Sequence, residues 1–178
     1  CELVQTIDIA PTLLEYFDLE PLQDIDGCSL LSVVKDHQKI HDTALFGVHG
    51  GQINLFDGKY VYMKSGLKDK PIYNMTLMPT LMRGFISPEA IDQATFVNGG
   101  KYSHGHKVLQ IPSGPFIPLK EPYPDAVYDL TKDPKQEHNS INEDLQKALD
   151  AKLKTAMLKA GAPSWQMERM GFTTYEEK

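Results

Sequence analysis

The sequence predicts a small α+β protein, in which an antiparallel β-sheet packs against a long C-terminal helix. Asp57-Gly58 separates two runs of strand-forming residues, which is a strong signal for a β-hairpin. In the last third of the chain an apolar residue recurs at every fourth position, which is typical of a helix with one buried face: Leu145, Leu149, Leu153 and Met157. A helical segment is also expected at the N-terminus.

The N-terminal segment predicts two helices. Pro11 suits a first helical turn, so the first helix is expected from Pro11 to Phe17, with Asp8 as its cap. Its apolar face consists of Leu13, Leu14 and Phe17. A second, shorter helix is expected over residues 29–35, capped by Ser29.

The centre of the chain predicts strands around the hairpin. Residues 44–49, 52–56 and 59–64 are rich in apolar and aromatic side chains. Both residues of the Asp57-Gly58 turn are expected to have positive φ, as a two-residue hairpin turn requires.

Residues 65–124 carry much less periodicity and are interpreted as an excursion over the surface of something larger. Ser87-Pro88 predicts the start of a helix, and residues 107–111 predict a short strand. The proline-rich stretch from Pro112 to Pro124 is expected to be a connection, not a sheet interior.

The C-terminal third begins with a predicted short strand over residues 126–128 and a turn rich in Asp and Asn. The last helix follows, with Ser140 and Glu143 at the spacing of a capping box. Gly161 and Pro163 are expected to end it. Beyond the helix, the segment that carries Trp165 and Phe172 is expected to pack back onto the protein.

Composition excludes several classes of function. The hydrophobic fraction of 41% and the charged fraction of 24% over 178 residues are those of a globular protein. The net charge of −6 argues against a nucleic-acid or anionic-membrane partner. No apolar run approaches the roughly 20 residues needed to span a bilayer. The two cysteines leave the compartment open, so either a cytoplasmic or an exported, bacterial-type soluble enzyme is compatible with the sequence.

Three segments together resemble the C-terminal part of the sulfatase family, within the alkaline-phosphatase superfamily. They are residues 6–14 with Asp26-Gly27, residues 57–62 around the hairpin turn, and residues 128–134. The resemblance implies that residues 1–40 are the end of the large α/β domain and that residues 41–178 are the C-terminal subdomain. Because the chain opens on Cys1, we expect it to be a portion of a longer protein. The expected partner is the remainder of its own catalytic domain, and the apolar face of the first helix also predicts a homo-oligomer.

The resemblance implies a hydrolase of sulfate esters that depends on calcium and on a formylglycine made from Cys/Ser-x-Pro-x-Arg. Neither Cys1 nor Cys28 stands in that motif, and no serine does. We therefore expect no catalytic residue, no metal ligand and no cofactor in this chain, and expect calcium and formylglycine in the parent enzyme. Two alternatives stay open: a phosphonate or phosphodiester hydrolase of the same superfamily, and a non-catalytic binding or structural module.

The predicted substrate-side residues are His49, Lys64 and Arg83. His49 ends a predicted strand beside Gly50-Gly51, where a side chain can be presented to a neighbouring pocket. Lys64 and Arg83 carry the charge that suits an anionic substrate. The structural alternatives, which the sequence favours, are a partly buried strand histidine and solvated surface charges.

Two further candidates for metal binding are weighed against structural roles. His104-Gly105-His106 has the alternating spacing of a zinc or copper pair, although a Gly-rich surface loop is favoured. Asp8 lies in the most family-like segment, but a helix cap is the favoured role for an Asp before a Pro-started helix.

Overall fold

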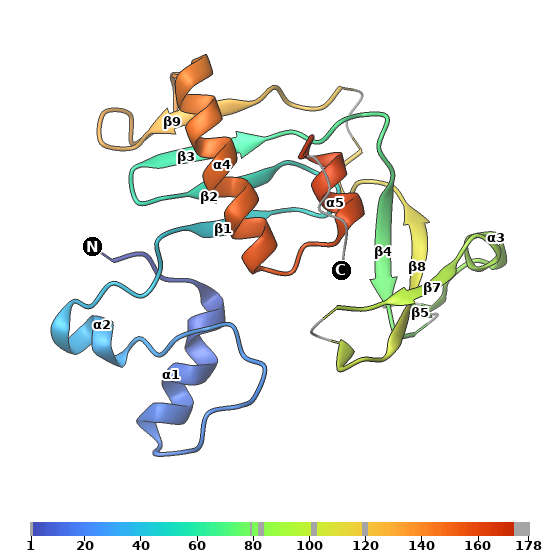
Figure 1. Cartoon of the computed structure of the whole chain (residues 1–178), viewed down its shortest axis with the longest axis horizontal. Helices are drawn as coiled ribbons and strands as arrows, with labels where there is room; N and C mark the ends of the chain where they lie inside the picture. Colours follow the sequence, from blue (N-terminus) through green and yellow to red (C-terminus); the bar gives the residue numbers. More distant parts are fainter. Residues whose placement is uncertain (1, 79, 82–83, 101–102, 119–120, 173–178) are drawn as a thin grey trace. The chain divides into compact units, whose positions relative to one another are not determined.

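The computed structural model describes residues 2–78, 80–81, 84–100, 103–118 and 121–172 (Figure 1). The chain forms two compact units, each assembled from several stretches of sequence. The first unit comprises Cys1–Phe46, Asn54–Met63 and Ala126–Asp150, and the second comprises Gly47–Ile53, Lys64–Asp125 and Ala151–Lys178. Helices and antiparallel strands occur together, which confirms the predicted α+β class. The predicted domain boundary between residues 40 and 41 stays a prediction.

The first unit contains the N-terminal helices and most of a four-stranded sheet. The sheet has the order β1-β2-β3-β9, so the strand nearest the C-terminus pairs with the hairpin. Its elements are the 3₁₀-helix η1 (Thr6–Asp8), α1 (Ile9–Tyr16), α2 (Leu31–Asp36), β1 (Ala44–Gly47), β2 (Ile53–Phe56), β3 (Tyr60–Lys64) and β9 (Ala126–Asp129).

The hairpin between β2 and β3 is confirmed, but its turn lies one residue later than predicted. Asp57 N–H donates to the Tyr60 carbonyl at 3.3 Å, which leaves Gly58 and Lys59 as the central residues. Gly58 has a φ of +90°, whereas Asp57 has no positive φ. The Asp57 carboxylate instead accepts the N–H groups of Lys59 and Tyr60, at 3.0 and 2.8 Å. The turn therefore depends on an Asp side chain as well as on a glycine.

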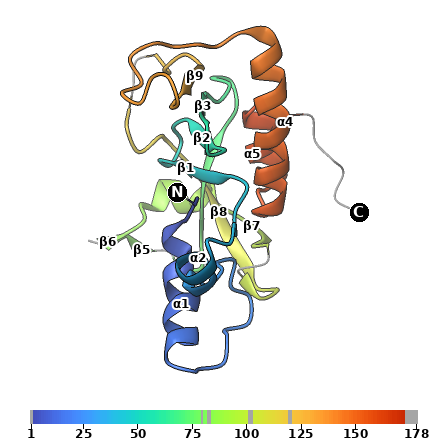
Figure 2. The same ribbon diagram turned by 90° about the vertical axis from the view of Figure 1, so that its left-hand side faces the viewer.

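The long helix α4 (Glu143–Lys159) packs on the four-stranded sheet (Figures 1 and 2). Tyr62 and Val127, on β3 and β9, are fully buried, and the Tyr62 hydroxyl donates to Asp150 on the helix at 2.8 Å. The predicted apolar stripe of the helix is buried at Leu149, Leu153 and Met157. Burial of each of these side chains contributes roughly 2 kcal/mol to folding.

The predicted capping box of α4 is wrong, because Ser140 makes a different contact. The Ser140 N–H and hydroxyl both donate to the Val127 carbonyl, at 2.8 and 3.0 Å. Asn142 caps the helix instead, since its side-chain oxygen accepts the Leu145 N–H at 3.0 Å. The predicted end of α4 is confirmed by Gly161, which has a φ of +74°.

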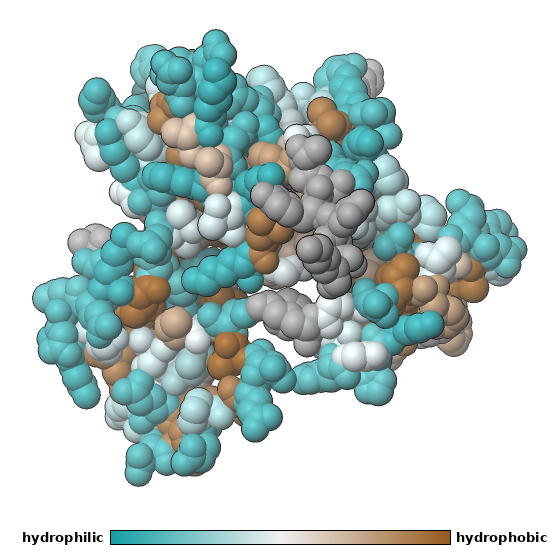
Figure 3. All heavy atoms as spheres, in the orientation of Figure 1, coloured by the Kyte–Doolittle hydropathy of each residue, from teal (hydrophilic) through white to brown (hydrophobic). Residues whose placement is uncertain are grey.

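Helix α1 starts at Ile9, two residues before the predicted start, and Pro11 lies buried inside its first turn. Its apolar face is open to solvent: Leu13 is 51% and Phe17 is 64% exposed. In Figure 3 hydrophobic residues reach the surface at lower left, the region that α1 and α2 occupy in Figure 1. Ser29 does not stand at the N-cap of α2, although its hydroxyl accepts the Leu31 N–H at 3.2 Å.

The second unit holds most of the regular structure that the sequence did not predict. A three-stranded sheet of order β4-β8-β7 and a short β5-β6 pair occupy the region that was interpreted as an irregular excursion. The elements are β4 (Ile72–Thr76), β5 (Thr80–Leu81), β6 (Gly84–Phe85), α3 (Pro88–Asp92), β7 (Thr95–Asn98), β8 (Lys107–Ser113) and α5 (Ser164–Arg169). The predicted start of α3 is confirmed, because the Ser87 hydroxyl accepts the Ala90 N–H.

Pro112 lies inside β8, which contradicts its predicted place in a connection. It is paired with Tyr73 of β4. Because proline has no N–H, this pair cannot exchange hydrogen bonds, so the Pro112 nitrogen faces the opposite edge of β8. On that edge β7 reaches only as far as Gln110. Proline is therefore tolerated in the middle strand because β7, the strand on the side that its nitrogen faces, does not extend as far as Pro112.

The segment after α4 packs back, as predicted. The Trp165 ring of α5 stands edge-on to the Tyr73 ring of β4, with centroids 5.3 Å apart. Met167, Met170 and Phe172 are buried. None of the helices within the described ranges is long and apolar enough to cross a membrane.

Candidate functional site

The turn that joins β1 to β2 presents His49, one of the predicted substrate-side residues. The Gly51 N–H closes the turn by donating to the Val48 carbonyl at 3.0 Å. Gly50 has a φ of +71°, and a Cβ on it would lie 2.5 Å from the Cα of Pro115. Glycine is thus required here both for backbone conformation and for the close approach of another segment.

Arg169, at the end of α5, is buried and donates hydrogen bonds to the backbone of this turn. Its Nη2 donates to the Gly50 carbonyl at 2.5 Å, and both Nη atoms lie 3.3 Å from the Gly51 carbonyl. The Arg169 residue is only 6% exposed. Burial lowers the pKa of Arg169, but a guanidinium stays protonated at all physiological pH values.

The backbone around Gly66 forms the other wall of the guanidinium site. A Cβ on Gly66 would lie 2.5 Å from Cζ of Arg169, so any side chain there would displace the guanidinium. The Leu67 N–H donates to the Arg169 carbonyl at 2.7 Å, which fixes the end of α5 to the same segment. The position of Arg169 is therefore determined by its own backbone as well as by the turn that it holds.

His49 itself is exposed, and its ring lies beside a serine of the second unit. Its Nε2 lies 3.5 Å from Oγ of Ser113, at the end of β8. Ser113 Oγ also accepts a hydrogen bond from Nδ2 of Asn74, at 3.0 Å. The Phe116 N–H donates to the His49 carbonyl at 2.8 Å. The imidazole of the turn and the hydroxyl at the end of β8 thus lie side by side, and hydrogen bonds from Arg169 and Phe116 hold the turn backbone.

Lys64, the second predicted substrate-side residue, is packed inside its unit. Its side chain is only 13% exposed, and its Nζ lies 3.8 Å from Oδ2 of Asp125 and 5.5 Å from the centroid of the Phe172 ring. The same carboxylate accepts the Ser65 N–H at 2.8 Å. Lys64 is thus engaged with an acid and an aromatic ring. Arg83, the third predicted residue, lies outside the described residues.

Asp8 is the most completely enclosed acid in the first unit. The residue is 0% exposed, and its carboxylate accepts the backbone N–H groups of Gln5 and Cys28, at 2.7 and 3.0 Å. Nε2 of His41 lies 2.9 Å from both carboxylate oxygens. The side chain does not cap α1 as predicted; it ties three separate segments together. Its role in this structure is nevertheless structural, which agrees with the favoured interpretation.

The Asp8 carboxylate has no free place for a metal ion. Each oxygen already accepts one backbone N–H and faces the His41 ring. Burial on its own raises the pKa of Asp8, but the hydrogen bonds from Cys28, Gln5 and His41 outweigh it, and the net pKa is below the ordinary value. The carboxylate is therefore ionised and fully used by the protein.

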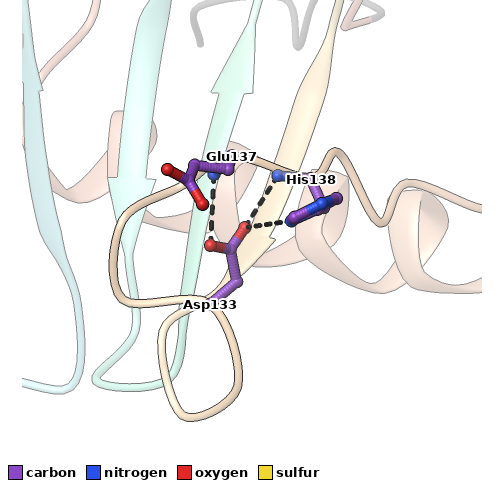
Figure 4. Close-up of side chains that lie close together, drawn as sticks. All are labelled: Asp133, Glu137 and His138. Atoms are coloured by element: carbon purple, nitrogen blue, oxygen red, sulfur yellow. Dashed lines mark hydrogen bonds and ion pairs between the residues drawn. The ribbon is translucent and has the colours of Figure 1, made fainter.

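Asp133, Glu137 and His138 form the one cluster of three potential metal ligands that the described part of the chain contains (Figure 4). Figure 4 shows the Asp133 carboxylate directed at backbone N–H groups of the turn. It accepts those of Glu137 and His138, at 3.1 and 2.8 Å. These bonds, from His138 first and then Glu137, lower the pKa of Asp133. The cluster is an exposed turn stabilised by its own acid, and exposed acids of this kind are common without an ion.

His104 and His106 lie in a turn before β8 and not on a strand. His104 has a φ of +49°, and the His106 N–H donates to the Ser103 carbonyl at 2.9 Å. The alternating spacing therefore does not place the two rings on one face of a sheet. Neither histidine belongs to a three-ligand cluster within the residues that the structure describes.

Calcium and formylglycine in the parent enzyme stay predictions. The acids that are best enclosed already accept backbone hydrogen bonds, and the sequence holds no Cys/Ser-x-Pro-x-Arg. Sequence reasoning missed Arg169 and Ser113, because neither stands in a recognisable motif. The available signal for Arg169 was a single arginine among the apolar residues Trp165, Met167, Met170 and Phe172.

Comparison with protein-family models found no match, and comparison with curated proteins found none either.

Proposed function

We propose that this chain is the C-terminal portion of a sulfatase-family hydrolase that acts on sulfate esters, and that the chain itself holds no nucleophile and no metal ligand. In this proposal it contributes packing and substrate-side residues to a catalytic domain formed by the rest of the protein. Calcium and formylglycine belong to that remainder. His49 is the described residue best presented for contact with a substrate.

The observation that carries the proposal is that segments which resemble the family meet in space although they lie far apart in sequence. Tyr60 of the hairpin motif pairs with Asp129 of the C-terminal motif. The Leu130 N–H donates to the Lys59 carbonyl at 2.9 Å, and Nζ of Lys59 lies 3.5 Å from Oδ2 of Asp129. Two motifs about 70 residues apart thus form one ladder, which supports their origin in a common fold.

The N-terminal motif behaves in the same way. Gly27 of the Asp26-Gly27 pair approaches the Ile7 backbone so closely that a Cβ would lie 2.0 Å from the Ile7 carbonyl oxygen. The next residue donates its N–H to Asp8. Helix α1, which this arrangement positions, leaves Leu13 and Phe17 largely exposed. An ordered helix with an uncovered apolar face supports a partner domain or a second copy of the chain as its cover.

The test is to assay the chain alone and the complete gene product side by side. We expect an aryl sulfate to be hydrolysed by the complete protein in the presence of calcium and not by the chain alone. We also expect the gene to encode Cys/Ser-x-Pro-x-Arg upstream of Cys1. An aryl phosphate serves as the second substrate, because the motifs do not separate sulfate from phosphate esters.

Each outcome has a defined meaning. If only the phosphate ester is hydrolysed, the protein would instead be assigned to the phosphonate and phosphodiester hydrolases of the superfamily. Turnover by the chain alone would refute the absence of a nucleophile. A gene product that hydrolyses neither ester would favour a non-catalytic binding or structural module.

A further inference from the structure

We propose that His49 and Ser113 bind a tetrahedral oxyanion together. Arg169 is the positioning residue, because it donates hydrogen bonds to the backbone of the turn that carries His49. The identity of the ligand as a sulfate ester rests on the proposed function. The oxyanion contact itself rests on the geometry and charge of the second unit and can be tested without hydrolysis.

The charge of Arg169 is the first argument. Its guanidinium is buried, and its hydrogen bonds go to the carbonyls of Gly50 and Gly51 and, at 3.9 Å, to the sulfur of Met170. None of the carboxylates in the described part of the chain forms an ion pair with it. A buried charge is unfavourable unless it is compensated, and neutral carbonyls compensate it only in part. The surface over this turn therefore favours a negative ligand.

The second argument is that the groups able to touch a ligand are hydrogen-bond donors. His49 is exposed, and its Nε2 and the Ser113 hydroxyl are 3.5 Å apart, so both can reach oxygens of one tetrahedral anion. The amide of Asn74 donates to Ser113 Oγ at 3.0 Å, and the Ser113 hydroxyl donates to the Gly114 carbonyl at 3.1 Å, a bond that it would exchange for one to the bound anion. Arg169 points to backbone carbonyls, so it acts through the turn and not by direct contact.

The third argument is that the turn is held in one position. The close approach of Gly50 to Pro115 and the hydrogen bond from Phe116 to His49 fix it on one side. Arg169 fixes it on the other, and the guanidinium has room only because residue 66 is a glycine. Groups held in advance lose less entropy on binding, which favours affinity for a small ligand.

The experiment is an anion titration of the chain followed by NMR of the six histidine rings. Sodium sulfate is added at constant ionic strength, and sodium phosphate is used in a parallel series. The His49 resonance is assigned by its loss in His49→Gln. We expect it to shift saturably with either anion, while the His104 ring serves as the exposed reference and responds only weakly and linearly.

Variants separate the role of Arg169 from general folding. Arg169→Met removes the charge and should weaken the anion affinity at least tenfold, whereas Arg169→Lys keeps the charge and should retain part of it. Gly66→Ala should also weaken affinity, because its methyl group displaces the guanidinium without removing it. Gln93→Ala is the control, since this uncharged residue is exposed at the end of α3 in the same unit and takes no part in the contact. The indole resonance of Trp165, which packs against Tyr73 in the same unit, verifies that each variant is folded.

Three results would overturn the proposal: a linear response of His49, an equal response of His104, or unchanged affinity in both Arg169→Met and Gly66→Ala. Failure of the proposed function gives a different pattern. In that case the complete protein hydrolyses neither ester, while the His49 resonance of the chain still titrates saturably with the free anion.

Discussion

Replacing Asp8 with alanine should release the N-terminal segment from the rest of its unit. The fully buried carboxylate accepts two backbone N–H groups and faces the His41 ring, all within 3.0 Å. A hydrogen bond to a charged group contributes about 1.5–3 kcal/mol. The three donors form hydrogen bonds to water when the segment opens, which offsets part of the loss. We therefore expect Asp8→Ala to lower the free energy of opening by about 3 kcal/mol, which raises the equilibrium constant for opening roughly 100-fold.

Amide hydrogen exchange measures this loss at the donors themselves. In Asp8→Ala, the Gln5 and Cys28 amides should lose protection by roughly 100-fold, which is the same estimate expressed as an exchange ratio. Amides of the β3–β9 ladder should change little. Asp92→Ala, at the exposed end of α3, is the matched control. Protection at Gln5 and Cys28 that stays within about threefold of wild type would refute the reasoning, because one weak hydrogen bond accounts for that much.

The same bonds predict a pH dependence with a defined sign. The pKa of Asp8 in the folded protein is below its ordinary value, so the ionised carboxylate stabilises the fold. This contribution is fully present above the unfolded pKa of about 4 and is lost as the pH falls through the lowered folded pKa. After correction for intrinsic exchange rates, protection of the Cys28 amide should fall below about pH 4 in wild type. A wild-type profile as flat as that of Asp8→Ala would contradict this.

Further predictions concern the free energy of unfolding in urea. Leu153→Ala should lower it by about 2–5 kcal/mol because the side chain is fully buried on α4, whereas the half-exposed Leu158→Ala should change it by less than about 0.5 kcal/mol. Asn142→Ala should lower it by about 1 kcal/mol through loss of the α4 cap. Gly27→Ala should lower it by about 1–3 kcal/mol, since its methyl group would meet the Ile7 backbone, and Gly114→Ala should have no measurable effect. For Leu153 and Gly27, a loss in the control variant as large as in its partner would contradict the assignment, and for Asn142 an unchanged free energy of unfolding would do so.

The elements that the sequence predicted are those whose signals are local. The Ser87-Pro88 helix start, the Gly161 helix end and the Asp57-Gly58 hairpin each depend on residues within one turn of each other. Strands β4 and β7 were missed because they are short and mix polar with apolar residues. The pairs between β4 and β8 are 33 to 41 residues apart and those between β7 and β8 are 9 to 15 apart, and no local pattern encodes such partners.

The candidate site was predictable only in part, for a related reason. His49 was recognised because Gly50-Gly51 follows it directly. The groups around it come from distant segments, and Arg169 contacts the turn 118 residues away through carbonyl oxygens. Every residue type has a backbone carbonyl oxygen, so the sequence does not indicate which residues accept hydrogen bonds from Arg169. A capping box at Ser140 was predicted from spacing, but the β9 backbone offered Ser140 a better acceptor.

Pro112 also determines what the open edge of β8 can do. Beyond Gln110, β7 no longer pairs with this edge, and a strand from another molecule would need alternating donors and acceptors along it to add to the sheet. At Pro112 the donor is missing, so such a strand can form at most half of the usual pair of hydrogen bonds. The residue that fits poorly into a sheet interior thus protects the protein from edge-to-edge aggregation, at the position where its own sheet is incomplete.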